Sequence, residues 1–199
     1  MMDATRAVDP AIFSHIRVVL SMVVSLGIAR LLSGAAKFVQ HPGRKRPYFV
    51  HLLWVVSLLL SMMDFWWWEF SLSHLQTWRF ETYFFIVAYA ALFYFLCALL
   101  FPDDLAEYEG YRDYFMSRRK WFFGLLATTY IVDILDTLIK GREHLTAQGY
   151  EYPIRAIAFL LLCMLAARTA NERFHAAFAA ISLAYQISWI LRLHDVMSI

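Results

Sequence analysis

Apolar runs of about the length of a membrane-crossing helix recur along this chain and leave little sequence between them. A helix that crosses the ~30 Å hydrocarbon layer of a bilayer needs ~20 predominantly apolar residues. Hydrophobic residues make up 61% of the 199 residues and charged residues only 17%. The chain can therefore supply about six such helices, with roughly 79 residues left for loops and termini. This balance excludes a soluble catalytic domain, a disordered chain, a disulfide scaffold and a nucleic-acid module.

The order of these runs predicts an all-α fold, a polytopic integral membrane helical bundle that forms a single transmembrane domain over residues 1–199. Prolines, glycines and charged clusters separate the runs and set the expected ends of each helix. The six expected transmembrane helices cover residues 11–39, 48–70, 80–101, 121–139, 152–167 and 174–193. The first could also be a re-entrant or interfacial segment, because only twelve uncharged residues separate Arg17 from Arg30.

The connection between the third and fourth runs is the longest polar segment of the chain. Within it, apolar and aromatic residues recur at helical spacing at Leu105, Tyr108, Tyr111 and Phe115. A helix with one apolar face lies along a membrane surface. We therefore expect one short interfacial helix over residues 103–117.

Lysine and arginine are unevenly distributed between the two sides of the predicted bundle. The connections after the first, third and fifth spans hold ten of these residues, and the opposite side holds six. Cytoplasmic loops of membrane proteins are enriched in Lys and Arg, so both termini are expected to face away from the cytoplasm. The expected location is the bacterial plasma (inner) membrane, with the lipid bilayer as a partner and no nucleic acid.

Four of the six expected helices carry a polar stripe that lipid would reject. At about 100° per residue, each set of residues below falls on one face of its helix. The sets are Ser14, Arg17, Ser21 and Ser25 on the first helix; Trp54, Ser57, Ser61, Asp64 and Trp68 on the second; Thr129, Asp133, Asp136, Thr137 and Lys140 on the fourth; and Ser182, Tyr185, Gln186, Trp189 and Arg192 on the sixth. The stripes therefore predict a polar interior between these helices.

Six polar side chains are expected at the same depth in the membrane, because consecutive spans cross it in opposite directions. The predicted cluster consists of Arg17, Asp64, Asp133, Asp136, Gln186 and Arg192. A charge near the bilayer centre costs ~2.5 to 3.5 kcal/mol on insertion scales, so charged residues face a bundle interior or a wet cavity and pair with one another. We expect the three carboxylates to contact Arg17 or Arg192. Two interpretations stay open: a buried salt-bridge cluster that sets helix register, and a polar cavity that binds an ion or a small solute.

The cavity interpretation favours a small transporter or channel-like protein that binds a proton, a cation or a small polar solute. Asp133 and Asp136 lie three residues apart on one helix face, where they can share a proton or a cation. The alternatives are a membrane-embedded enzyme or cofactor-binding protein, and a structural or assembly subunit of a membrane complex.

Signatures of an enzyme or a cofactor site are weak. The chain has no phosphate-binding glycine loop, nucleophile elbow, Cys-x-x-Cys or His-Glu-x-x-His motif, which argues against an enzyme. Two pairs of histidines are expected at matching depths, His15 with His194 and His51 with His175. All four lie near predicted span ends, where a histidine needs no ligand role, so no haem, metal or other cofactor is expected.

A row of small side chains follows one face of the sixth expected helix. It consists of Ala176, Ala180, Ala184 and Ser188, at strict four-residue spacing. Small residues let another helix approach closely. The row is expected either to pack within the chain or to form the seam of a homodimer.

Overall fold

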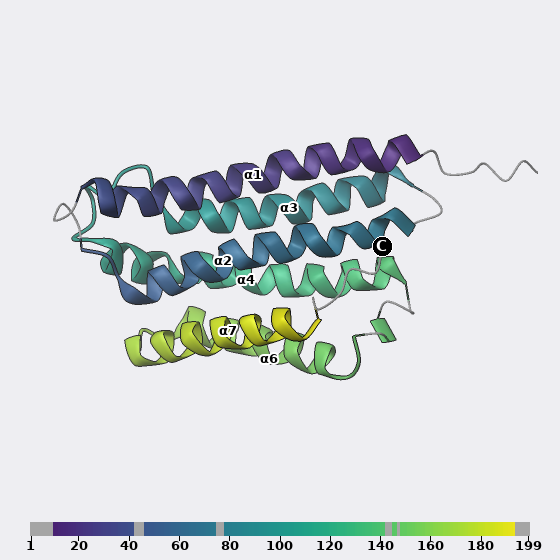
Figure 1. The fold of residues 1–199 in the computed structure, drawn as a ribbon. Coiled ribbons are helices and arrows are strands. Elements are labelled where there is room, and N and C mark those ends of the chain that lie inside the picture. The colour runs from purple at the N-terminus through teal and green to yellow at the C-terminus, as the bar shows by residue number, and fades with distance from the viewer. Residues whose placement is uncertain (1–9, 42–45, 75–77, 142–144, 147, 194–199) are drawn as a thin grey trace, which may run out of the picture.

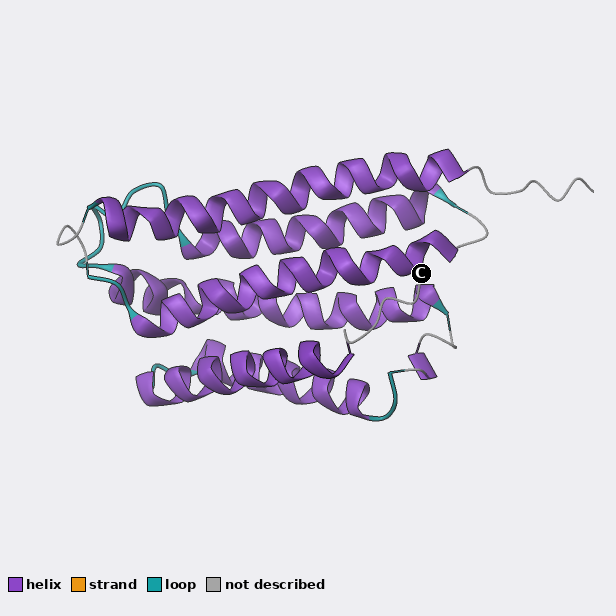
Figure 2. Cartoon of the chain, in the orientation of Figure 1, coloured by secondary structure: helices purple, strands orange, loops and turns teal. Residues whose placement is uncertain are grey.

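A computed structural model gives the fold and describes residues 10–41, 46–74, 78–141, 145–146 and 148–193. Within these residues the chain is helical and holds no β-strand (Figure 2). The helices, labelled in Figure 1, are α1 (Pro10–Gln40), α2 (Phe49–Trp68), the 3-10 helix η1 (Glu69–His74), α3 (Phe80–Leu100), α4 (Tyr111–Lys140), α6 (Glu151–Arg168) and α7 (Glu172–Leu193). The all-α bundle predicted from the sequence is confirmed.

Five of these helices are long and apolar enough to cross a membrane, namely α1, α2, α3, α4 and α7. The protein is therefore an integral, multi-pass membrane protein in contact with lipid. α6 is not among the five, because its 18 residues include three charged ones, Glu151, Arg155 and Arg168. The fifth expected crossing, over residues 152–167, stays a prediction.

The prediction of a short interfacial helix over residues 103–117 is wrong. Residues 103–110 form turns and bends, and the remainder of that segment is the beginning of α4. Tyr114 and Phe115 are buried in the bundle, and the Tyr114 hydroxyl donates to the Leu99 carbonyl at 2.8 Å. The first thirteen residues of α4 contain neither proline nor glycine. The helical spacing in the sequence therefore belongs to one long helix that packs against its neighbours.

Consecutive helices run in opposite directions, so the bundle has two ends (Figure 1). The polar end, named for Lys140, holds the beginnings of α1, α3 and α6 and the last turns of α2, α4 and α7. The aromatic end, named for Tyr111, holds their opposite termini. α2 is central and contacts α1, α3, α4 and α7. This alternation brings the late residues of α2, α4 and α7 to one end of the bundle.

Aromatic side chains fill the middle of the bundle. Trp54 of α2 is 2% exposed, and its ring centroid lies 5.4 Å from that of Phe122, 5.6 Å from Phe123 and 5.3 Å from Phe178. Phe115 continues the cluster toward the aromatic end. Edge-to-face pairs at such separations attract one another beyond the effect of burial. The cluster therefore joins α2, α4 and α7 and closes the bundle between Trp54 and the aromatic end.

Gly34 of α1 lies directly against the Phe101 ring, and this close approach predicts the effect of a substitution. A Cβ atom at Gly34 would come within 2.2 Å of the ring, which is itself buried at 1% exposure. Overpacking a tight site costs about 1–3 kcal/mol, so we expect Gly34→Ala to lower the melting temperature of the protein in detergent.

Gly124 of α4 provides the matched control for Gly34. A Cβ atom at Gly124 meets no atom of the described residues within 4 Å. Alanine is favoured over glycine inside a helix by about 1 kcal/mol, so Gly124→Ala should keep or raise the melting temperature. An unchanged melting temperature in the Gly34→Ala protein would contradict the close packing of α1 on Phe101.

Candidate functional site

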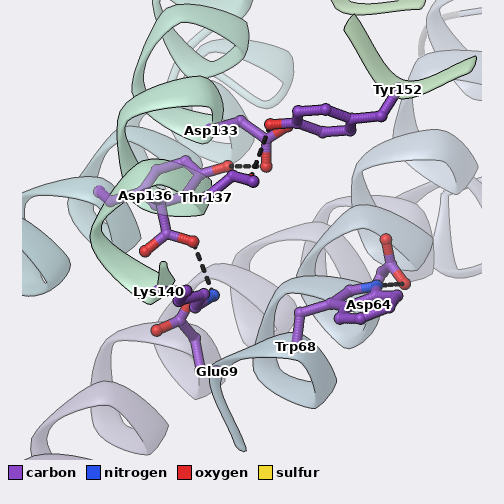
Figure 3. A network of polar contacts seen from close by, with 9 residues as sticks. Asp64, Trp68, Glu69, Asp133, Asp136, Thr137, Lys140 and Tyr152 are labelled. Carbon is purple, nitrogen blue, oxygen red and sulfur yellow. Dashed lines mark hydrogen bonds and ion pairs between the residues drawn. The ribbon is translucent and has the colours of Figure 1, made fainter. Parts of the chain in front are cut away.

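A cavity of about 140 Å³ lies toward the polar end, between α2, η1, α3, α4, α6 and α7. It is partly open, and it has room for several water molecules or one small solute. Within the described part of the chain, its charged lining consists of four carboxylates and two cations, namely Asp64, Glu69, Asp133, Asp136, Lys140 and Arg155. Figure 3 shows five of these side chains at close range.

Lys140 is the centre of the most deeply buried charge group. Its Nζ lies 2.6 Å from Asp136 Oδ2 and 2.9 Å from Glu69 Oε1 (Figure 3). All three side chains are at most 5% exposed. Asp136 and Lys140 are one turn apart on α4, whereas Glu69 begins η1 directly after α2. These ion pairs therefore tie the end of α4 to the end of α2.

The Lys140 group holds two carboxylates against one ammonium, so its charges do not balance when both acids are ionised. Glu69 Oε2 and Asp136 Oδ1 are buried and have no hydrogen-bond partner among the described residues. A buried acid without a full set of partners tends to keep its proton. Glu69 lies outside the five membrane-crossing helices, and burial, followed by the nearby Asp136 charge, raises the pKa of its carboxyl to about 7. The group is therefore suited to take up and release a proton near neutral pH.

The raised pKa of Glu69 predicts that the folded protein loses stability as the pH rises. The pKa of Glu69 is about 7 in the folded state and has the ordinary value of 4.5 in the unfolded state. Between these two pH values the folded state binds the proton more tightly than the unfolded state. This stabilisation is full below pH 4.5 and is lost as the pH rises to about 7. We expect the melting temperature in detergent to fall over this range, and Glu69→Gln to flatten the fall. A fall of equal size in the Glu69→Gln protein would assign it to another group.

Asp133 lies one turn earlier on α4 and forms a second polar group with α3 and α6. Its carboxylate accepts hydrogen bonds from the hydroxyls of Tyr89 at 3.2 Å and Tyr152 at 3.0 Å. The Tyr152 hydroxyl also lies 2.8 Å from Thr137 Oγ1, and Arg155 Nη2 lies 3.7 Å from the same carboxylate. The Asp133 side chain is 30% exposed, so this group is more accessible than the Lys140 group.

Gln186 joins α7 to α2 on another wall of the cavity. Its amide nitrogen donates to Ser61 Oγ at 2.8 Å, and its amide oxygen accepts from Ser57 Oγ at 2.8 Å. Asp64, further along α2, accepts a hydrogen bond from Trp68 Nε1 at 3.1 Å (Figure 3). The polar stripes predicted on the second and sixth helices therefore meet at this wall.

Buried polar atoms without a partner gather at the cavity. In the described part of the chain there are nine such side-chain nitrogen and oxygen atoms, and five belong to residues that line the cavity. Trp54 Nε1, Arg155 Nε and Ser182 Oγ can donate, and Glu69 Oε2 and Asp136 Oδ1 can accept. Buried polar groups in native proteins almost always have a partner. Unsatisfied polar atoms are therefore concentrated in the residues around the cavity.

The cavity brings together four of the six residues of the predicted cluster. These are Asp64, Asp133, Asp136 and Gln186. Arg17 lies instead over three aromatic rings, with its guanidinium carbon 5.2 Å from the ring centroids of Trp66 and Phe70 and 5.7 Å from that of Phe13. Arg192 pairs with Glu151 at 2.7 Å, and both side chains are about half exposed. Neither arginine lines the cavity.

Lys140 pairs with Asp136, and Arg155 lies beside Asp133, which corrects the pairing of these two carboxylates expected with Arg17 or Arg192. Lys140 was predicted on the polar stripe but not in the cluster, although an acid four residues before a lysine on a helix is a known pairing signal. Arg155 is a cation inside a predicted span and needs a partner on that ground alone. The hydrogen bond from Tyr89 to Asp133 could not be predicted, because a tyrosine on an apolar helix is usually a packing residue.

The histidines at the aromatic end bond to backbone carbonyl oxygens. The Nε2 atom of His51 lies 2.7 Å from one such oxygen, and that of His175 lies 3.1 Å from another. His15 is exposed, and His194 lies outside the described residues. No group of three or more His, Cys, Asp or Glu side chains in the described ranges is placed to hold a metal ion.

The row of small residues on α7 faces outward. Ala180, Ala184 and Ser188 are exposed, and Ala176 is half-buried. The described residues therefore leave most of this face uncovered, which differs from packing within the chain. The homodimer that would use the row stays a prediction.

No family model matches this chain, and no curated protein and no solved structure is significantly similar to it. The helices establish a multi-pass membrane protein. Its more specific function has to be inferred from the chemistry of the cavity.

Proposed function

We propose that this protein is a small transporter that binds a proton or a small cation in the cavity near the polar end. The observation that carries the proposal is the charge of the cavity lining. Among the described residues, four carboxylates against two cationic side chains leave a formal charge of −2 when every acid is ionised. An acidic cavity with low-dielectric walls concentrates cations and holds protons.

A salt-bridge cluster with a purely structural role is the competing interpretation of the same residues. Removing one partner from a buried ion pair costs several kcal/mol, because the other charge is stranded. A structural cluster is therefore expected to balance its charges and satisfy its polar atoms. The excess of carboxylates over cationic side chains among the described lining residues supports a binding site instead.

Access to the cavity supports a transporter over an open channel. Asp133 is 30% exposed, so the cavity is not sealed by the described side chains. On the side of the cavity that faces the aromatic end, Trp54 is 2% exposed and packs within its aromatic cluster. A site at membrane depth that is open on one side and closed on the other is typical of one state of alternating access.

The loop charges assign a direction to this access. On the rule that cytoplasmic loops are enriched in Lys and Arg, the polar end and both termini face away from the cytoplasm of a bacterial plasma membrane. The cavity then takes its cation from the non-cytoplasmic side. Reporter fusions after residues 43, 75, 110, 146 and 171 should alternate between the two sides of the membrane. Two successive fusions on one side would contradict the six-span topology.

Thiol accessibility tests the cavity directly. Cysteines placed at Ser61, Thr129 and Ser182 should react with a small, positively charged, membrane-impermeant thiol reagent, because all three positions line the cavity. Ser61 is half-buried whereas Thr129 and Ser182 are buried, so the cysteine at Ser61 should react fastest. The two native cysteines are buried and serve as the background. Ala184→Cys is the control on the outer face of α7, where the reagent is excluded by lipid. Reaction at Ala184 alone would contradict an accessible cavity.

Flux measurements test the transport step. Purified protein in liposomes should move protons or a small cation, and Asp133→Asn and Asp136→Asn should each remove that flux. Asp104→Asn is the matched control, because Asp104 is exposed and lies at the aromatic end. Inert cavity cysteines together with no flux that depends on Asp133 or Asp136 would overturn the transporter proposal in favour of a structural role.

A further inference from the structure

An apolar groove adjoins the cavity on the outside of the bundle. It lies between α1, α2 and α7 and has a volume of about 600 Å³. Its apolar lining includes Val24, Ile28, Leu60, Met63, Trp66 and Ile190. Asp64 lines both this groove and the cavity. The groove and the acidic cavity therefore adjoin at Asp64.

The cavity is lined for an organic cation. Ten of its 25 lining residues are aromatic, and ring faces attract ammonium and guanidinium groups. The protein already uses this attraction, since the Arg155 guanidinium carbon lies 4.3 Å from the Trp189 ring centroid and 5.2 Å from that of Tyr152. An ammonium ion needs only such rings and a nearby carboxylate, whereas a metal ion needs several converging ligands.

We propose that the ligand is an amphipathic organic ammonium whose charged head binds in the cavity and whose alkyl tail lies in the groove. This inference rests on the proposed function and specifies its ligand class. The cavity of about 140 Å³ accommodates a head group, and the groove of about 600 Å³ accommodates a chain. A charged head group is costly in hydrocarbon, but in the cavity it is attracted by the Asp64 carboxylate and by the aromatic rings. The tail stays in apolar surroundings, whether it lies in lipid or in the groove.

The competing occupant of the groove is an anionic amphiphile. Arg17 is the cation beside this region, and its guanidinium carbon lies 5.2 Å from the centroid of the Trp66 ring that lines the groove. An anionic head would pair with Arg17, whereas an ammonium head pairs with Asp64. The sign of the head group therefore decides between the two occupants.

The test uses the full chain in a neutral maltoside detergent. Two photoreactive probes are compared, an alkyl trimethylammonium and an alkyl sulfate. Their tails are of equal length, about twelve carbons, and each tail carries a diazirine. Both tails enter the micelle equally, so a difference in labelling reports the head group. We expect the ammonium probe to label peptides with Leu60 and Met63 about fivefold more than the sulfate probe. Asp64→Asn should remove this difference, and Asp104→Asn should preserve it.

A second variant covers the case in which Asp64→Asn does not fold. Ser25→Trp fills the groove, which Ser25 lines, and leaves every carboxylate in place. It should abolish groove labelling while tetramethylammonium still protects a cysteine at Ser61 from the thiol reagent. Leu32→Trp is the control, because Leu32 is exposed on the same helix outside the groove. Unchanged labelling in the Ser25→Trp protein would overturn the tail position.

Tetramethylammonium also separates the failure of this inference from the failure of the proposed function. If it protects the cavity cysteine but both probes label the groove equally, the groove is not the tail site and the cation site stands. If it gives no protection and labelling is again equal, both proposals are overturned. Stronger labelling by the sulfate probe would replace the ammonium ligand with an anionic amphiphile held by Arg17.

Discussion

Replacing Lys140 with methionine is expected to cost about 3–5 kcal/mol of stability. The substitution leaves Glu69 and Asp136 without the cation that they share at 2.9 and 2.6 Å. Both carboxylates are at most 5% exposed, so bulk water compensates little for the loss of the ammonium. We therefore expect a large fall in melting temperature, or a loss of monodisperse protein on extraction into detergent.

The control for this substitution is Lys120→Met, which makes the same chemical change at an exposed position of the same helix. It should alter the melting temperature little. Adding Glu69→Gln to Lys140→Met should recover part of the loss, because it removes one of the two stranded charges. Equal melting temperatures for the Lys140→Met and Lys120→Met proteins would rule out a stabilising ion-pair group at this end of the bundle.

Replacing Arg155 with glutamine is expected to tighten the binding of a small ammonium ion by about tenfold. Arg155 occupies the Trp189 ring face at 4.3 Å and lies 3.7 Å from the Asp133 carboxylate, so it fills the place that a bound cation would take. Its removal also changes the formal charge of the cavity lining from −2 to −3. Titration of purified protein with tetramethylammonium, followed by melting temperature or calorimetry, measures the effect.

Asp133→Asn should weaken binding of the same ion by a similar factor, because it removes the most accessible carboxylate near that ring. Arg168→Gln at the far end of α6 is the control, since Arg168 is exposed and does not line the cavity. The opposite effects of the Arg155 and Asp133 variants distinguish binding from general destabilisation. Weaker binding in the Arg155→Gln protein would make Arg155 a structural partner of Asp133 and remove its role as an internal competitor.

Helix positions could be predicted closely because they depend on local properties of the chain. The third expected span, residues 80–101, corresponds to Phe80–Leu100 in the structure, and the first, residues 11–39, corresponds to Pro10–Gln40. A bilayer demands a continuous apolar helix of a set length, and breakers mark its ends. The same reasoning failed at residues 103–117, because spacing alone does not distinguish a separate surface helix from the first turns of a longer one.

The gathering of four of the polar residues at one end of the bundle follows from the alternating direction of the spans, which brings the late residues of α2, α4 and α7 together. Asp64, Asp133, Asp136 and Gln186 accordingly line one cavity. Their ionic partners could not be predicted. A stripe assigns a residue to one face of its own helix, but the neighbour that this face meets depends on how the helices are arranged around it. Arg17 shares the depth of the cavity and still lies outside it, over Trp66.

The sequence by itself determined an all-helical membrane protein with charged and polar side chains gathered in one half of its bundle, because hydrophobic length and helical period are properties of each segment. Only the tertiary structure decided that Lys140 lies between Asp136 and Glu69, that Arg155 lies beside Asp133, and that the cavity adjoins an apolar groove. The ion pairs among these contacts join α4 to η1 and to α6, which are separate segments of the chain. Ion pairs form between whichever helices pack together, and packing is settled by side chains along their whole length.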